Sequence, residues 1–300
     1  MTIGRFAPSP SGRMHLGNVF AALMAWCSAR SQGGEIVLRV EDLDPQRTSP
    51  AFAEQIKTDL LRLGLDWDRE VPWQSTRTAA YDEAFAKLQA MGLVYPCYCS
   101  RSQVHAASAP HQGESEYVYP GTCRNLTSAE RAAKTRPPCW RLRVPAEDWT
   151  VRDRVQGDYT ENLERDCGDF VIRRADGVYA YQLAVVVDDA ANGVTEVVRG
   201  RDLLSSAPRQ RYLFHLLGLP APEYAHVPLL LAPDGRRLSK RDADMDLDAL
   251  LTRYTPDQLL GLLAHASGLL PRPEPISAPD LAAIFDWNKV QKGNVCLQVP

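Results

Sequence analysis

The chain has 300 residues, enough for one large or two modest domains, and its 45% hydrophobic content is sufficient for a core. Its 34 Lys and Arg against 37 Asp and Glu give a net charge of −3, which argues against a uniformly basic surface that wraps nucleic acid but allows a local basic groove. The longest apolar runs are far shorter than the roughly 20 residues of a membrane span, so a transmembrane protein is excluded.

The first fifty residues predict a strand, a loop, a helix and a second strand. Ile3–Phe6 reads as a short strand, Pro8–Gly17 as a loop rich in Pro, Ser and Gly, and Val19–Arg30 as a helix. A pair of glycines then turns the chain into Glu35–Glu41, whose Val and Ile content favours a buried strand. This βαβ order predicts a parallel α/β sheet.

Further elements follow in an α/β pattern. A helix is expected to begin at Ser49-Pro50 and to bury one face, made of Phe52, Ile56, Leu60 and Leu63. The next predicted elements are a helix over Thr78–Met91, a strand over Trp140–Val144, α/β segments at Val178–Val187 and Thr195–Val198, a helix over about Ala207–Leu217, and a strand over Val227–Leu231. From Leu247 onward we expect helices, with Pro271–Pro275 as a break between two of them.

The cysteines and the N-terminus bear on the compartment. Seven cysteines, an odd number spread along the chain, do not resemble the dense disulfide framework of a small secreted domain. Arg5 and Arg13 before the apolar stretch Val19–Cys27 loosely imitate a signal peptide, but prolines, a glycine and His15 interrupt the basic region. We therefore expect a cytoplasmic protein.

The loop from Arg5 to Asn18 has the sequence RFAPSPSGRMHLGN and places Gly12, His15 and Gly17 between a strand and the N-terminus of a helix. Glycines let the backbone approach a ligand, the helix start offers unpaired N–H groups, and an imidazole can donate to a phosphoryl oxygen. The loop therefore suits a phosphate, although a single loop histidine is more often structural.

A second loop, Asp234–Arg241 with the sequence DGRRLSKR, places four cations within six residues. A solvated charged loop would explain this pattern. A flexible Ser-Lys loop, however, can also bring positive charge to a departing pyrophosphate.

Together the two loops resemble the two signature motifs of class I aminoacyl-tRNA synthetases. The segments Arg5–Gly12, Arg39–Pro45 (RVEDLDP) and Val198–Leu203 (VRGRDL) are similar to the glutamate branch of that class, so the resemblance spans residues 3–241. Asn18 departs from the last histidine of the first signature, which puts the second phosphate contact in doubt. The second signature has arginines at 237 and 241 in place of a lysine and a serine.

The resemblance implies an α/β fold. We expect a Rossmann-type, parallel-sheet class I catalytic domain over residues 1–245, interrupted at about 93–177 by an inserted zinc-containing subdomain, and a short helical C-terminal region over 246–300. The residues after the second loop are too few for the helical anticodon-binding region of full glutamyl-tRNA synthetases, so no such domain is expected.

The expected zinc site lies in the insertion. Cys97, Cys99, Tyr119 and Cys123 are spaced like the zinc ligands of a truncated, glutamyl-queuosine branch of paralogues, which attach glutamate to the modified base queuosine in tRNA(Asp). Three thiolates could occupy three corners of a tetrahedron, with tyrosine as an unusual fourth ligand. The alternative is four ordinary buried side chains, because the chain carries cysteines elsewhere as well.

The resemblance also implies the residues that bind substrates. Those for ATP, with Mg²⁺, are Pro8, Gly12, His15, Gly17, Asn18, Leu238, Ser239 and Lys240, of which His15 and Lys240 are the catalytic pair. Those for glutamate are Arg5, Ala7, Ser9, Glu41, Tyr181 and Arg199. Paired arginine N–H groups on a carboxylate would distinguish glutamate from glutamine. Weak surface ion pairs and a core tyrosine are the ordinary alternatives.

These features predict a monomeric enzyme, not bound to membranes, that activates L-glutamate with ATP and transfers it to queuosine in the anticodon loop of tRNA(Asp). Three alternatives stay open: a truncated glutamyl-tRNA synthetase that charges the terminal ribose, a nucleotidyltransferase of small substrates, and a non-catalytic binding paralogue. The nucleotidyltransferase would not explain the segments around Arg39 and Arg199. A non-catalytic paralogue would be expected to lose His15 or Lys240, and this chain has both.

Overall fold

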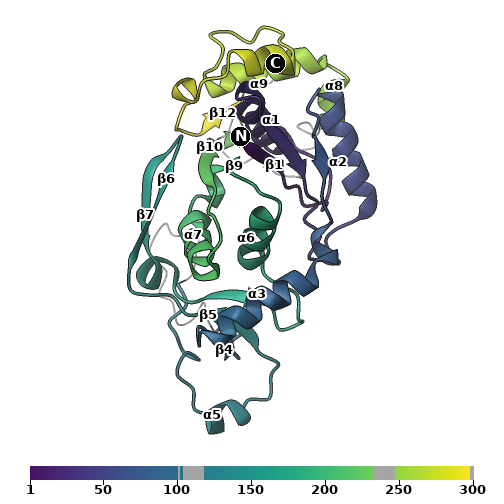
Figure 1. The fold of residues 1–300 in the computed structure, drawn as a ribbon. Coiled ribbons are helices and arrows are strands. Elements are labelled where there is room, and N and C mark those ends of the chain that lie inside the picture. The colour runs from purple at the N-terminus through teal and green to yellow at the C-terminus, as the bar shows by residue number, and fades with distance from the viewer. Residues whose placement is uncertain (101, 104–117, 233–234, 236–246, 298–300) are drawn as a thin grey trace.

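The computed structural model describes residues 1–100, 102–103, 118–232, 235 and 247–297 (Figure 1). Three residues with predicted roles, Leu238, Ser239 and Lys240, lie outside the described residues. None of the helices in the described ranges is both long and apolar enough to span a lipid bilayer.

Two sheets meet edge to edge at the centre of the α/β part. The first has the parallel order β1 (Ile3–Phe6), β2 (Glu35–Leu38), β3 (Arg69–Glu70). The second has the order β7 (Gly157–Asn162), β6 (Asp148–Asp153), β10 (Glu223–Val227), β9 (Glu196–Gly200), with β9 and β10 parallel. The N–H of Thr195 donates to the carbonyl of Ile3 at 2.9 Å and so places β9 beside β1. The predicted parallel α/β fold is confirmed.

Helix α1 (Leu16–Ser31) is the central helix of the larger core. It is apolar almost all round, and its side chains are buried between the sheets and the C-terminal helices α9 (Pro256–Ser267) and α10 (Ala278–Ala283). The helix begins three residues before the predicted Val19, because the backbone N–H groups of Asn18 and Val19 both donate to the carbonyl of His15.

Helix α2 (Pro50–Arg62) begins at the predicted Ser49-Pro50 pair. Its inward face contains Ile56, Leu60 and Leu63 as expected, but Phe52 is 38% exposed, so the prediction for this residue was wrong. Ala53 is the buried residue of that turn. With 3.6 residues per turn, repeated steps of four drift off the buried face, and Phe52 is rotated by about 100° from Ala53.

Three segments that the sequence predicted from their apolar residues take different structures. Most of Val178–Val187 lies in helix α6 (Tyr181–Ala191), whereas Thr195–Val198 enters β9. The predicted strand Val227–Leu231 is broken: β10 ends at Val227, and β11 (Leu230–Leu231) pairs instead with β12 (Val295–Cys296). Pro228 follows β10 directly, and its missing N–H cannot continue the ladder.

Residues 93–177 divide between two locations. The strands β4 (Val94–Cys97), β5 (Cys139–Leu142) and β8 (Phe170–Arg173) form an antiparallel sheet, with α5 (Ser128–Ala132) at the lower end of the view in Figure 1. This sheet shares a second core with α3 (Thr78–Ala90), α6 and α7 (Ser206–Leu217). The hairpin β6–β7 instead extends the sheet of β9 and β10.

The C-terminal part is helical, as predicted. Helix α8 (Leu247–Leu251) precedes α9, and the proline-rich break at Pro271–Pro275 separates α9 from α10. Short helical turns complete the described part of the chain: η1 (Gln74–Thr76), η2 (Leu163–Cys167), η3 (Arg201–Leu203) and η5 (Trp287–Lys289).

Candidate active site

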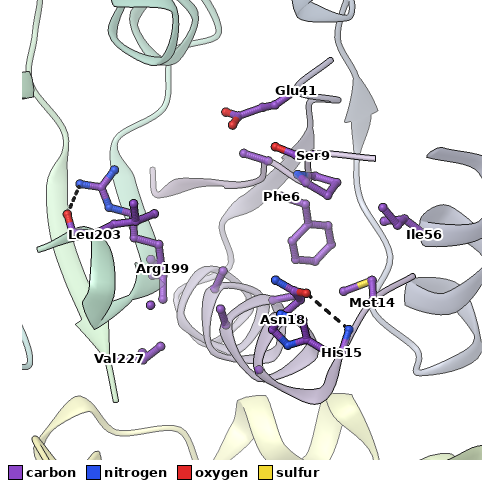
Figure 2. Close-up of a pocket in the computed structure, with 18 of the residues that line it drawn as sticks. Phe6, Ser9, Met14, His15, Asn18, Glu41, Ile56, Arg199, Leu203 and Val227 are labelled. Carbon is purple, nitrogen blue, oxygen red and sulfur yellow. Dashed lines mark hydrogen bonds between the residues drawn. The ribbon is translucent and has the colours of Figure 1, made fainter. Parts of the chain in front are cut away.

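A cavity of about 480 Å³ opens beyond the carboxyl ends of β1, β9 and β10, next to the N-terminus of α1 (Figure 2). This is the location at which parallel α/β sheets bind ligands. Every described residue predicted to bind ATP or glutamate lines it: Arg5, Ala7, Pro8, Ser9, Gly12, His15, Gly17, Asn18, Glu41, Tyr181 and Arg199. The structure therefore brings together in one space eleven residues that are up to 194 positions apart in the chain.

The first motif loop shows why its residue types are needed. His15 is the N-cap of α1, and its backbone N–H donates to the side-chain oxygen of Asn18 at 3.4 Å (Figure 2). A Cβ at Gly17 would lie 3.2 Å from two atoms of the His15 ring, so a larger residue there would displace the imidazole. Gly12 has φ of +147°, a conformation that other residues rarely adopt. Asn18 thus acts in helix capping, which explains how this position can differ from histidine.

Arg5 and Arg39 share one buried carboxylate. Arg5 is 5% exposed, donates to the carbonyl of Val198 at 3.0 Å and lies 3.7 Å from Asp189. Arg39 is fully buried and contacts Asp189 at 2.6 Å and Glu41 at 3.1 Å. Burial lowers the pKa of Arg5, while the charge of Asp189 opposes this shift. No role for Asp189 was predicted, because in the sequence it is only the second member of an acidic pair, Asp188-Asp189, after an apolar run.

Glu41 brings a negative charge to the same cavity. Burial raises the pKa of its carboxyl group, and the nearby charges of Arg39 and Arg5 act in the opposite direction. Its side chain points into the cavity in Figure 2. A carboxylate held in this way can accept the ammonium group of an amino acid.

Arg199 has a partner for each part of its guanidinium. Nη1 donates to the hydroxyl of Tyr181 at 3.1 Å and to Gln210 at 2.9 Å, and Nη2 donates to the carbonyl of Leu203 at 3.2 Å. Nε donates to Nε2 of His226 at 2.9 Å. Tyr181 is therefore in contact with the predicted carboxylate-binding arginine rather than an isolated core residue. Neither Gln210 nor His226 was identified from the sequence.

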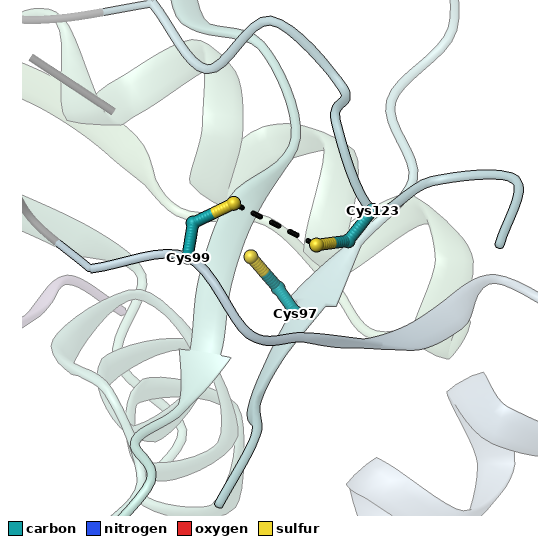
Figure 3. A group of neighbouring side chains, drawn as sticks. All are labelled: Cys97, Cys99 and Cys123. Atoms are coloured by element: carbon teal, nitrogen blue, oxygen red, sulfur yellow. Dashed lines mark hydrogen bonds between the residues drawn. The ribbon is translucent and has the colours of Figure 1, made fainter. Parts of the chain in front are cut away.

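The four predicted metal ligands also lie together. The sulfur atoms of Cys97, Cys99 and Cys123 are all within 4.8 Å of one another, and those of Cys99 and Cys123 are 3.6 Å apart (Figure 3). The hydroxyl of Tyr119 lies 3.4 Å from Cys97 Sγ and 3.9 Å from Cys99 Sγ. A hydrogen bond from Cys139 lowers the pKa of the Cys97 thiol, although its burial acts in the opposite direction. Such a cluster of soft ligands can hold a metal ion.

Comparisons with known proteins agree with this geometry. The family model of the class I tRNA synthetase (E and Q) catalytic domain matches residues 2–259. The glutamyl-Q tRNA(Asp) synthetase of Symbiobacterium thermophilum is 48% identical, covering 97% of this chain and 94% of its own. That of Nocardia farcinica is 50% identical, with 94% and 89% covered. The solved glutamate tRNA ligase of Elizabethkingia meningosepticum, in complex with its amino acid, is 26% identical with a TM-score of 0.83, and the match covers 99% of this chain and 67% of that one.

The family match extends over most of the chain, and the near-full-length relatives share close to half of its residues. The enzyme class predicted from the two motif loops, an aminoacyl ligase, is confirmed. The chain therefore belongs to the class I tRNA synthetases of the glutamate and glutamine branch and, within them, to the glutamyl-Q tRNA(Asp) synthetases.

Proposed function

We propose that this chain activates L-glutamate with ATP and transfers it to the queuosine base in the anticodon loop of tRNA(Asp). The observation that carries this proposal is one cavity that Arg5, Arg199 and Glu41 line together with the loop around His15. Two arginines suit the two carboxylates of glutamate, and Glu41 suits its ammonium group. The names of the relatives support the choice of queuosine as acceptor.

In the first step, a carboxylate oxygen of glutamate attacks the α-phosphorus of ATP, and pyrophosphate leaves with the electrons of the broken P–O bond. His15 and the N-terminus of α1 stabilise the negative charge that develops on the phosphoryl oxygens. Lys240, outside the described residues, supplies the second positive charge. Bound Mg²⁺ would neutralise the phosphates of ATP.

In the second step, a hydroxyl oxygen on the cyclopentene ring of queuosine attacks the activated acyl carbon. AMP leaves with the electrons of the mixed-anhydride bond, and the hydroxyl loses its proton. The arginine on the side-chain carboxylate and Glu41 on the ammonium group keep their contacts with glutamate, so the acyl group stays oriented between the two steps.

The acceptor is tested with four RNAs and radiolabelled glutamate. We expect label on queuosine-containing tRNA(Asp) and on its isolated anticodon stem-loop, and none on tRNA(Asp) without queuosine or on tRNA(Glu). Because the RNA would be held by local Lys and Arg contacts to phosphates, transfer should weaken as salt rises. Label on the terminal ribose of tRNA(Glu), with none on the stem-loop, would identify a glutamyl-tRNA synthetase instead.

We also propose that Cys97, Cys99, Tyr119 and Cys123 hold one structural Zn²⁺, because three thiols and a hydroxyl converge at distances that fit one ion. All seven cysteines are free thiols, so no disulfide competes for the ligands. The ion would join the end of β4 to the segment around residues 119–123 and offset most of the negative charge of the thiolates.

The zinc proposal predicts about one equivalent of zinc per chain, measured by metal analysis. Cys123→Ser should lose it, because structural zinc needs all four ligands. Cys139→Ser is the matched control: its sulfur donates to the carbonyl of Cys97 at 3.4 Å, outside the ligand group, so this variant should keep the metal. Zinc loss should loosen the residues around the cluster and leave the α/β core folded. Folded parent protein without zinc would refute the proposal.

A further inference from the structure

Arg199 is hydrogen-bonded to a buried histidine that does not line the cavity. His226 on β10 is fully buried, and its Nε2 atom accepts a hydrogen bond from Nε of Arg199 at 2.9 Å. The guanidinium keeps its proton at any ordinary pH, so the facing Nε2 atom must present a lone pair. The ring proton of His226 is therefore on Nδ1.

That proton has a matching acceptor. Nδ1 of His226 lies 2.6 Å from Oδ2 of Asp153 on β6, which is also buried. The other carboxylate oxygen, Oδ1, accepts the backbone N–H groups of Val155 at 2.9 Å and Gln156 at 2.8 Å. The hydrogen bonds with His226 hold the pKa of Asp153 below its usual value, although burial opposes this shift. The carboxylate thus sets which nitrogen of His226 carries the proton.

We infer that Asp153 and His226 form a positioning relay that orients Arg199 for the carboxylate of the substrate. The relay rests on the proposed role of Arg199 in glutamate binding. It runs from β6 through β10 to β9, across three adjacent strands, and it keeps the guanidinium in one orientation before substrate arrives. Both relay members are positioning residues, since neither lines the cavity.

The Asp153→Asn variant tests the relay through the tautomer. Oδ1 accepts the backbone N–H groups of Val155, Gln156 and, at 3.1 Å, His226, so these donors will select the amide oxygen for that position. The amide NH₂ then faces Nδ1 of His226. Nδ1 must then accept, so the ring proton moves to Nε2 and meets the N–H of Arg199. Two donors face each other, and Arg199 has to move.

We expect Asp153→Asn to raise the KM for glutamate at least ~10-fold, with a smaller change in kcat, because substrate binding is lost more than charge stabilisation. The assay is pyrophosphate exchange into ATP with queuosine tRNA(Asp) present. Asp158→Asn is the matched control, the same change on an exposed residue of β7, and it should leave the KM unchanged. Thermal melting shows whether each variant is folded.

His226→Gln separates the relay from a general effect on folding. A glutamine amide can rotate to offer its oxygen to Arg199. Because it has no tautomers, Asp153→Asn cannot force it to present an N–H group to Arg199. Adding Asp153→Asn to it should raise the KM no further. An equal KM increase from Asp153→Asn in both backgrounds, or no increase in the parent, would overturn the relay.

The pH dependence provides a second readout. The groups that face His226 are Asp153, Arg199, Arg5 and the ring of Tyr224, which stacks on the imidazole with centroids 5.9 Å apart. Burial lowers the pKa of His226, with Asp153 acting against this shift, so the ring is neutral at neutral pH. As the pH falls through that lowered pKa, Nε2 gains a proton and the KM should rise in the parent. In His226→Gln this step should be missing, and only the titration of Glu41, which both proteins share, should raise the KM in acid. The same acid limb in both proteins would contradict the relay.

Arg199→Lys distinguishes a failed relay from a failed function. If Arg199 binds glutamate, lysine keeps the charge but loses the planar guanidinium that Tyr181 and His226 orient, and the KM should rise. No effect of Arg199→Lys would overturn the proposed glutamate contact. A KM effect in Arg199→Lys but none in Asp153→Asn would overturn only the relay.

Discussion

Replacing His15 with alanine is expected to slow glutamate-dependent pyrophosphate exchange by at least ~10²-fold, the order seen when one preorganised charge-stabilising donor is lost. The imidazole lines the cavity at the first residue before α1, where its ring lies beside Gly17. Its contact strengthens as charge builds on the α-phosphoryl group. The change should therefore lower kcat much more than it raises the KM for glutamate.

Two variants isolate this role from the start of the helix. Asparagine is a good N-cap residue, so His15→Asn should keep α1 intact and still show the rate loss. His265→Ala, at an exposed histidine of α9, should exchange at the parent rate. Exchange within a few-fold of the parent in folded His15→Ala would show that His15 does not stabilise the transition state.

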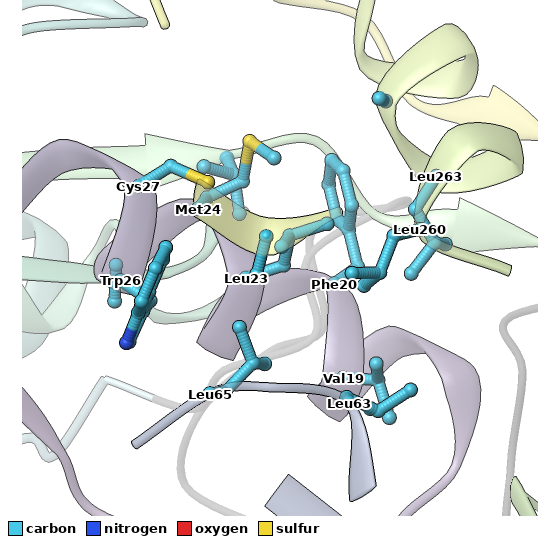
Figure 4. Close-up of a cluster of buried hydrophobic side chains, with 14 of the residues drawn as sticks. Val19, Phe20, Leu23, Met24, Trp26, Cys27, Leu63, Leu65, Leu260 and Leu263 are labelled. Carbon is cyan, nitrogen blue, oxygen red and sulfur yellow. The ribbon is translucent and has the colours of Figure 1, made fainter. Parts of the chain in front are cut away.

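Local patterns predicted the parts of the site that depend on neighbouring residues. The βαβ opening and the motif loop follow from glycines, prolines and apolar periodicity within about forty residues, and the structure confirms both. The helical apolar run after His15 is also local. In Figure 4 its Phe20 lies beside Leu260 of α9, in the same buried cluster as Leu23 and Leu263. The partner helix itself could not be identified from the pattern of α1.

The residues that hold the arginines were missed because their contacts join distant segments. Asp189 contacts Arg39 across 150 positions, and Asp153 contacts His226 across 73. Each looks in the sequence like a solvated acid or a strand-end polar residue. Only the order of strands, in which β6, β10 and β9 are adjacent, reveals that these groups are buried against one another.

The acidic pair on α6 separates two environments. Asp188 faces η1 and the start of α3. It accepts hydrogen bonds from Gln74 at 2.8 Å and the hydroxyl of Tyr81 at 2.7 Å and pairs with Arg77. Asp189 faces the cavity side and pairs with Arg39 and Arg5. One helix therefore links the scaffold of the second core to the charges of the substrate site.

Replacing Asp189 with alanine is expected to lower the free energy of unfolding by about 3–5 kcal/mol, because it leaves a buried charge without its partner. Arg39 is fully buried, so water cannot replace the lost carboxylate. Among the described residues only Glu41 would remain as its ion-pair partner. Arg5 would lose the nearby charge that offsets its burial. The measurement is the urea unfolding midpoint at neutral pH.

Two further variants, Asp189→Asn and Asp176→Ala, show whether the loss of stability comes from the buried ion pair. Asp189→Asn keeps the side-chain volume and removes the charge. A large decrease in the free energy of unfolding in both Asp189 variants would therefore come from the lost ion pair and not from a cavity. Asp176→Ala removes a half-exposed partner of Arg174 and should cost no more than about 1 kcal/mol. If Asp189→Ala cost as little as Asp176→Ala, Asp189 would not be needed to neutralise the buried guanidiniums. If Asp189→Asn alone were harmless, hydrogen bonding without charge would be enough to hold Arg39 and Arg5.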